Sequence, residues 1–181
     1  MQFDELMLAR RSVRKYQTKA VEPEKLRALI EAVRMAPSAS NTQPWKLILV
    51  DEPAVKEQVA KATFSGAIPF NKFTMEAPVI AVLAAEEHSV LTQVVGWMKK
   101  RPFYLVDIGI AAAQFCLQAT DLGLGTCMLG WFSEAEVKKA LKIPRAVRVA
   151  LLITVGYEAE NLPAHAKARK AAEVISSWNK Y

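Results

Sequence analysis

Positively charged side chains gather around one serine near the start of the 181-residue chain. Arg10, Arg11 and Arg14 place three guanidinium groups within five positions, and Ser12 lies among them. A guanidinium group stays charged at physiological pH and offers a planar fork of donors, so arginines beside a hydroxyl suit a phosphate. In an extended segment alternate side chains point to the same side, so Arg10, Ser12 and Arg14 could contact one anion. Taken alone, the stretch is equally compatible with a solvated basic turn.

The glycine-rich phosphate motifs do not explain such an anion site. Gly125 and Gly130 have the spacing of P-loop glycines, but Trp131 and Phe132 follow where that motif needs Lys and Ser or Thr. The stretch GLGTCMLG lies between a predicted helix and a predicted strand, which is the reverse of the dinucleotide-binding order. The sequence therefore disfavours nucleoside triphosphates and Rossmann-type NAD binding.

Metal-ligating residues are few and scattered. Cys116 and Cys127 form no C-x-x-C pair, and His88 and His165 stand alone. Packed thiols and solvated imidazoles are the favoured interpretation of these four residues, so the sequence predicts no metal site.

Composition narrows the class of protein. Hydrophobic residues make up 52% and charged residues 23%, which predicts a globular chain, and its length favours one domain. The net charge of +6 is spread along the chain without interleaved aromatic residues, so a small anionic ligand is favoured over nucleic acid. No uncharged apolar run is long enough to span a membrane, and the N-terminus carries two acids. We therefore expect a cytoplasmic protein with no membrane partner.

Hydrophobic periodicity divides the chain into alternating kinds of element. Apolar residues at helical spacing predict helices near 3–7, over 23–36, 55–63 and 133–141. They also predict a long helix that Asp107 can cap, with a first turn beginning there or a little earlier, and that Gly123 closes. Short runs rich in branched residues predict strands over 45–51, 77–85, 126–130 and 147–157. The second of these is nearly all apolar, which indicates a central strand covered on both faces. Residues 86–103 give no clear pattern.

This order of elements predicts an α+β fold with a central, mainly antiparallel sheet flanked by helices. The last segment, residues 158–181, has only a short apolar stripe at Ala171, Val174, Ile175 and Trp178. Such a tail is stable only against its own domain or a neighbouring subunit.

Five stretches in order resemble one known family. RRSVRKY, APSASNTQPWKLILV, DIGIAAAQFCLQATDLGLGTCMLGWF, LLITVGY and KARK together cover residues 10 to about 170 and resemble the FMN-dependent nitroreductases. The chain is at the short end of that family and lacks its longer helical insertions. The resemblance implies one FMN-binding domain over 1–181, a homodimer with FMN at its interface, and a C-terminal segment, 158–181, exchanged onto the partner's sheet.

The resemblance also assigns the cofactor contacts. It implies that the phosphate and ribityl chain meet Arg10, Arg11, Ser12 and Arg14 from the start of the chain, and Lys167 and Arg169 from its end. It implies that the flavin ring is lined by Pro37, Ser38, Ala39, Ser40 and Asn41, held by Gln43, and crossed by Met128, Leu129 and Gly130. Asn71 and Lys72 fall near the positions where members of the family place an Asn and a Lys over the pyrimidine edge of the flavin, and the match is open by about one residue. A surface loop is at least as good an interpretation of that pair. Some members carry an acidic residue where this chain has Leu129, so we expect a changed acceptor preference with flavin binding retained.

The implied activity is electron transfer from NADH or NADPH through FMN to an electron-poor acceptor such as a nitroaromatic or a quinone, in a ping-pong cycle. No side chain is predicted to be catalytic, because the flavin N5 carries the chemistry. Trp131, Phe132, Phe70 and Phe103 are possible stacking walls, although such aromatics more often belong to a core. Alternatives left open are a non-enzymatic flavin-binding or redox-sensing module, a specialised reaction such as dehalogenation or oxidative cyclisation, and a basic RNA-binding domain.

Overall fold

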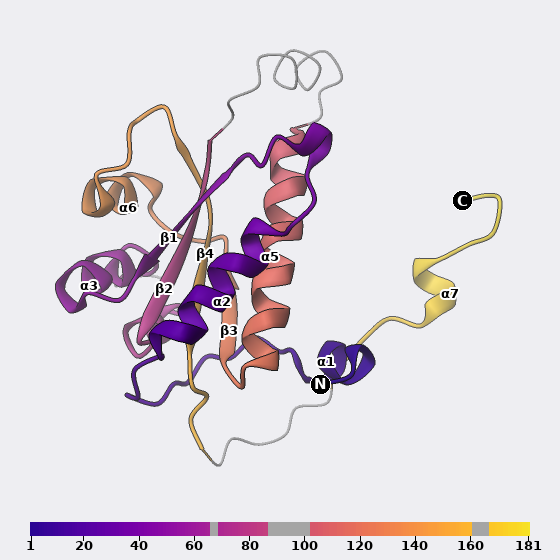
Figure 1. Ribbon diagram of the computed structural model, residues 1–181, viewed down its shortest axis with the longest axis horizontal. Coiled ribbons are helices and arrows are strands. Elements are labelled where there is room, and N and C mark those ends of the chain that lie inside the picture. Colours follow the sequence, from indigo (N-terminus) through magenta and orange to yellow (C-terminus); the bar gives the residue numbers. More distant parts are fainter. Residues whose placement is uncertain (66–68, 87–101, 161–166) are drawn as a thin grey trace.

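A four-stranded antiparallel sheet forms the centre of the molecule (Figure 1). The computed structural model describes residues 1–65, 69–86, 102–160 and 167–181. The sheet has the order β1-β2-β4-β3, in which every neighbouring pair is antiparallel. Its strands are β1 (Trp45–Val50), β2 (Val79–Ala85), β3 (Gly125–Leu129) and β4 (Arg148–Gly156). The predicted α+β class and antiparallel sheet are confirmed, and the four strands lie where the sequence predicts them.

Helices cover both faces of this sheet, as Figure 1 shows. On one face lie α2 (Pro23–Arg34) and α5 (Phe103–Asp121), and on the other lie α3 (Pro53–Lys61) and α6 (Glu134–Leu141). The short elements are α1 (Phe3–Ala9), α7 (Ala172–Ile175) and the 3-10 helices η1 (Ala39–Asn41) and η2 (Lys72–Met75).

The central strand β2 explains why both faces need covering. All seven of its residues are buried. Because side chains alternate along a strand, Ala81 and Leu83 pack in the cluster under α2 and α5, whereas Ile80 and Val82 pack under α3 and α6. The near-continuous apolar run predicted this two-sided burial.

The long helix α5 differs in one respect from its prediction. It begins at Phe103, with Pro102 at the N-cap position, so the prediction that Asp107 caps it is wrong. Asp107 lies inside the helix and is buried, because its carboxylate serves a tertiary contact described below. The predicted end is confirmed, since Gly123 has φ +75°, a conformation that favours glycine.

Among the described helices, α5 alone is long and apolar enough to cross a membrane. Ile108, Ala111 and Phe115 on its buried stripe pack against α2 and the sheet. It is therefore a core helix of this domain. Most of the unassigned stretch 86–103 lies outside the described residues, as do His88 and His165.

The basic segment runs beside the edge strand β3. Ser12 bridges Thr126 in parallel register, and the Val13 N–H donates to Thr126 O at 2.8 Å. Val13 is buried so closely against Gly125 that a Cβ there would come within 2.6 Å of Val13 Cγ2. Gly125 is therefore required for this contact, which fixes the segment against the sheet.

The C-terminal segment stands apart from the body in Figure 1. Val174, Ile175 and Trp178 expose 68%, 72% and 90% of their surface. The predicted apolar stripe thus has no cover within its own described chain.

Candidate functional site

Arg10, Ser12 and Arg14 belong to the segment that runs beside β3. Burial raises the pKa of the Cys127 thiol in that strand, while the Arg14 charge, the Ser12 side chain and the Arg10 charge act in the opposite direction. The two charges and the Ser12 side chain therefore act on the same thiol, which is consistent with alternate positions in an extended segment.

Lys167 joins this group from the other end of the chain. Its Nζ donates to Met7 O at 2.5 Å and to Arg10 O at 2.7 Å, carbonyl groups in the last turn and at the C-cap of α1. A lysine satisfies such unpaired carbonyls well. Partial desolvation lowers the pKa of Lys167, and the nearby charges of Arg10 and Arg169 lower it further. The two basic stretches of the sequence thus meet, 157 residues apart.

Arg11 lies differently from its neighbours. Its Nη2 and Nε donate to Glu158 Oε2 at 2.7 and 3.2 Å. Because adjacent side chains of an extended segment point to opposite sides, Arg11 points away from the group formed by Arg10, Ser12 and Arg14. Its guanidinium group anchors the segment to the residues that follow β4.

The cations of this group form no ion pair within the described residues. Within the described part of the chain, no carboxylate lies at ion-pair distance from Arg10, Arg14, Lys167 or Arg169. Like charges held together are unfavourable unless an anion joins them. We refer to Arg10, Ser12, Arg14, Lys167 and Arg169 as the cation cluster.

The loop that follows α2 is the second predicted contact region. Ser40, Asn41 and Gln43 have φ of 50°, 54° and 47°, left-handed values that are uncommon outside glycine. The Gln43 N–H donates to Ser38 Oγ at 2.9 Å, and Gln43 Nε2 donates to Asn41 O at 3.1 Å. These bonds close the loop on itself and hold a conformation of the kind that occurs at ligand sites. We call residues 37–43, which include Pro37 and Ala39, the left-handed loop.

Asp107 positions this loop, a role the sequence did not assign. The Ala39 N–H donates to Asp107 Oδ1 at 3.2 Å, and Asp107 is only 5% exposed. A carboxylate in the apolar stripe of a core helix was the available signal, because a buried acid needs a partner.

Asn71 and Lys72 have separate environments. Asn71 is buried, and its Nδ2 donates to Thr63 O and to Trp131 O, both at 3.2 Å. Both amide hydrogens are therefore used within the protein, and the Asn71 carbonyl oxygen accepts from the Thr74 N–H at 3.0 Å. Lys72 is exposed and begins η2.

The end of β3 supplies the third predicted region. Met128 is 41% exposed, whereas the Leu129 side chain is buried in the core under α3 and α6. A Cβ added to Gly130 would meet no atom within 4 Å, so open space lies beside this backbone. A flat group could approach the main chain here without displacing a side chain.

The two halves of the predicted site lie far apart in one chain. Met1, just before α1, pairs with Asp121 at the last turn of α5, and the basic segment of the cation cluster follows α1. The left-handed loop is bound instead to Asp107, which lies near the N-terminal end of α5 (Figure 1). Fourteen residues of helix separate these anchors by about 21 Å. The loop also leads into β1, three strands or about 14 Å from β3. A single subunit therefore does not enclose one ligand with both.

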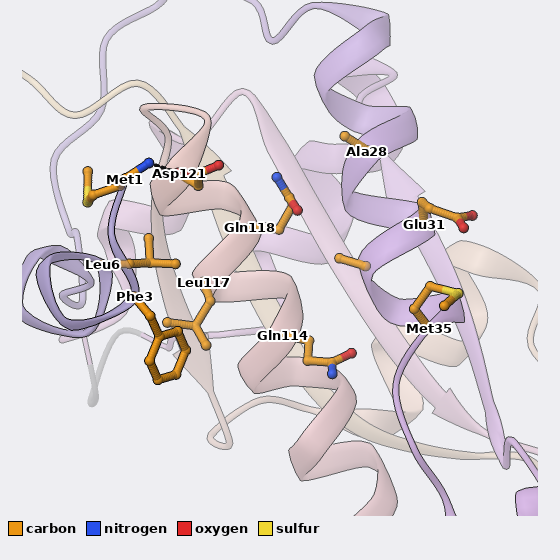
Figure 2. Close-up of a pocket in the computed structure, with 11 residues that line it drawn as sticks. Met1, Phe3, Leu6, Ala28, Glu31, Met35, Gln114, Leu117, Gln118 and Asp121 are labelled. Atoms are coloured by element: carbon orange, nitrogen blue, oxygen red, sulfur yellow. Dashed lines mark hydrogen bonds and ion pairs between the residues drawn. The ribbon is translucent and has the colours of Figure 1, made fainter.

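An apolar groove of about 620 Å³ lies between these two ends, on the outer side of α5. It is formed by α1, α2 and α5, and Figure 2 shows Phe3, Leu6, Met35 and Leu117 around it. Phe3 is 62% and Met35 63% exposed. Such large exposed apolar side chains are typical of a surface that another molecule covers.

Within the described residues, no three His, Cys, Asp or Glu side chains are arranged to hold a metal ion. The features available for chemistry are thus the cation cluster, a constrained loop and an open stretch of backbone.

Comparison with known proteins identifies the family. Residues 7–157 match the sequence model described as the nitroreductase family. An NADH dehydrogenase of Thermus thermophilus is 29% identical over 198 residues, covering 94% of this chain and 93% of its own. A nitroreductase family protein from Clostridium novyi NT has 31% identity and a TM-score of 0.77, over 88% of this chain and 87% of its own. An FMN-dependent nitroreductase from Clostridium difficile R20291 has 26% identity and a TM-score of 0.79, over 97% and 98%. The chain therefore belongs to the nitroreductase family and is an oxidoreductase of that family.

Proposed function

We propose that this protein is an FMN-dependent oxidoreductase that takes electrons from NADH or NADPH and passes them to an electron-poor acceptor such as a nitroaromatic or a quinone. The observation that carries this proposal is the cation cluster. Charges from both ends of the chain meet there around a serine, with no carboxylate of the described chain to neutralise them. A phosphate dianion is the ligand that such donors suit best.

The residues present fit FMN. Arg10, Arg14 and Lys167 would hold the phosphate through charge-assisted hydrogen bonds, and the Ser12 hydroxyl would donate to it. Arg169 adds positive charge, which draws the anion to this end of the subunit. The bound cofactor supplies the hydride and electron transfer, at its N5 atom, which no side chain of this chain provides.

The remaining regions orient the ring. The backbone of Leu129 and Gly130 borders it, because Gly130 leaves open space at that point. The left-handed loop would line the ring, with Asn41 as the residue that would hydrogen-bond its pyrimidine edge, while Gln43 holds the loop closed. Lys72 lies near the same edge, where a positive charge favours the reduced, anionic form of a flavin.

The assembly that fits these distances is a homodimer. A twofold axis across the outer side of α5 would bring the left-handed loop of one subunit to the cation cluster of the other, since they lie at opposite ends of the helix. The groove between α1, α2 and α5 then becomes part of the subunit interface. Residues 158–181 extend onto the partner, which would cover Val174, Ile175 and Trp178. The whole chain is then one domain with an exchanged tail. A cytoplasmic location stays a prediction.

A spectrum of the purified protein tests the proposal. We expect a yellow protein with the absorbance of bound FMN, at one FMN per subunit. Under nitrogen, NADH or NADPH should bleach this colour, and an added nitroaromatic should restore it. A colourless protein that FMN cannot restore contradicts the proposal and favours the RNA-binding alternative. A yellow protein that neither nicotinamide bleaches favours the non-enzymatic flavin module. Bleaching without recovery by any nitroaromatic or quinone points to a specialised reaction.

A further inference from the structure

Two large aromatic side chains lie exposed next to each other beside the end of β3. Phe70 is 60% and Trp131 57% exposed. Their ring centroids are 6.1 Å apart, with an angle of 54° between the planes. This separation is within the range of a favourable aromatic pair, and more than half of the surface of each residue is exposed and can contact a third ring.

The other aromatic residues considered as stacking walls have different surroundings. Phe132 is partly buried and packs against the core under α3 and α6. Phe103 is half-buried as the first residue of α5. The structure thus separates one exposed pair, Phe70 and Trp131, from a ring that contributes to the core and one that begins a helix.

A buried amide holds the two segments of this pair together. Asn71 follows Phe70, and its Nδ2 donates to the carbonyl oxygen of Trp131 and to that of Thr63. Thr63 Oγ1 in turn lies 2.9 Å from Thr74 Oγ1 in the buried interior. Because Asn71 is 6% exposed and both donors are satisfied, the pair has a fixed support rather than two independent loops.

The pair of Phe70 and Trp131 lies next to the backbone that borders the proposed flavin ring. Trp131 follows Gly130 directly, and open space lies beside Gly130. We propose that Phe70 and Trp131 form the surface on which the electron acceptor stacks, and that they select planar aromatic acceptors over saturated ones. This inference rests on the proposed flavin site and names the residues that determine specificity within it.

Ring contacts explain why this surface would discriminate. An aromatic acceptor gains ring-to-ring attraction in addition to the apolar area that it buries, whereas a saturated molecule of similar size gains only the area. With two rings contributing, we expect a preference of about tenfold. Leu in place of both rings keeps an apolar surface and removes that difference.

Calorimetric binding to the oxidised FMN-loaded protein tests the inference without turnover. The probes are 4-nitrobenzyl alcohol, which is planar, and cyclohexylmethanol, which is a saturated ring alcohol of comparable size. The native protein should bind the first about tenfold more tightly than the second. In the double variant Phe70→Leu, Trp131→Leu the ratio should fall below about threefold. The matched control is Phe132→Leu, which removes a neighbouring ring from the core side and should keep the native ratio.

Several readouts separate failure of this inference from failure of the proposed function. FMN content and thermal unfolding are measured for each variant, and both substituted residues are exposed, so we expect little change. If the double variant does not fold, the single variants Phe70→Leu and Trp131→Leu are used, and at least one should lose half or more of the preference. An unchanged ratio in folded, FMN-loaded variants overturns the inference, as does a native protein that binds both probes equally. A protein that never binds FMN contradicts the proposed function itself.

Discussion

Removing two guanidinium groups from the cation cluster tests the phosphate site most severely. The perturbation is the double variant Arg10→Ala, Arg14→Ala, in which Ser12 and Lys167 remain. Neither side chain has a carboxylate partner in the described residues, so their loss breaks no internal ion pair. We therefore expect the fold to persist and FMN affinity to fall.

The expected loss follows from the contacts removed. A hydrogen bond to a charged group contributes about 1.5–3 kcal/mol, so two such bonds contribute about 3–6 kcal/mol when desolvated. Arg14 is exposed and Arg10 half-buried, so solvent screens part of this energy, and Lys167 still holds the phosphate. A conservative loss of about 1.4 kcal/mol remains, which is a tenfold weaker dissociation constant at the least. The effect should shrink as salt is raised.

Fluorescence titration of the apoprotein with FMN measures this constant. The matched control is Arg11→Ala, which removes the same charge from the same segment but from the side that contacts Glu158. We expect the control to change FMN affinity less than about threefold while lowering thermal stability slightly, since a partly exposed pair is worth about 1 kcal/mol or less. Unchanged affinity in the double variant, or an equal loss in the control, would refute the assignment of the phosphate to this side of the segment.

Three further predictions concern the other parts of the site. Asp107→Ala should lower the free energy of unfolding by about 1.5–3 kcal/mol through loss of the Ala39 anchor, and Asp107→Asn by less, in chemical denaturation. FMN affinity should decline as pH rises through the pKa of Lys167, which lies below the ordinary lysine value of 10.5. The variant Lys167→Arg should keep its affinity over the same pH range, because arginine stays charged. An equal decline in that variant would count against a contact between Lys167 and the phosphate. Truncation after Tyr157 should give monomers without flavin in light scattering and absorbance, and a truncated dimer that holds FMN would exclude the tail from the site.

Local patterns predicted most of the fold correctly. Pro23 at the first turn of α2, Gly123 after α5 and Ser133 before α6 each mark a boundary that the structure has, because each acts on its neighbours in sequence. The Ser133 Oγ accepts from the Glu136 N–H at 3.5 Å, as the spacing predicts.

Contacts between distant residues were beyond such reasoning. Asp107 was expected to cap α5, because an acid near a helix start usually does, but Pro102 begins the helix and the carboxylate binds a loop 68 residues away. The pairing of Arg11 with Glu158 spans 147 residues, so alternation along the segment separates Arg11 from Arg10 but does not identify its partner. The contact of Lys167 with Arg10 was expected only through the family resemblance.

A crystal structure of the protein with FMN tests the central claim most directly. The account predicts the phosphate within hydrogen-bond distance, about 3 Å, of Arg10, Ser12, Arg14 and Lys167 of one subunit. It predicts the ring between the backbone at Gly130 of that subunit and the left-handed loop of the other. A phosphate bound away from this cluster, or a ring enclosed by one subunit alone, would contradict it.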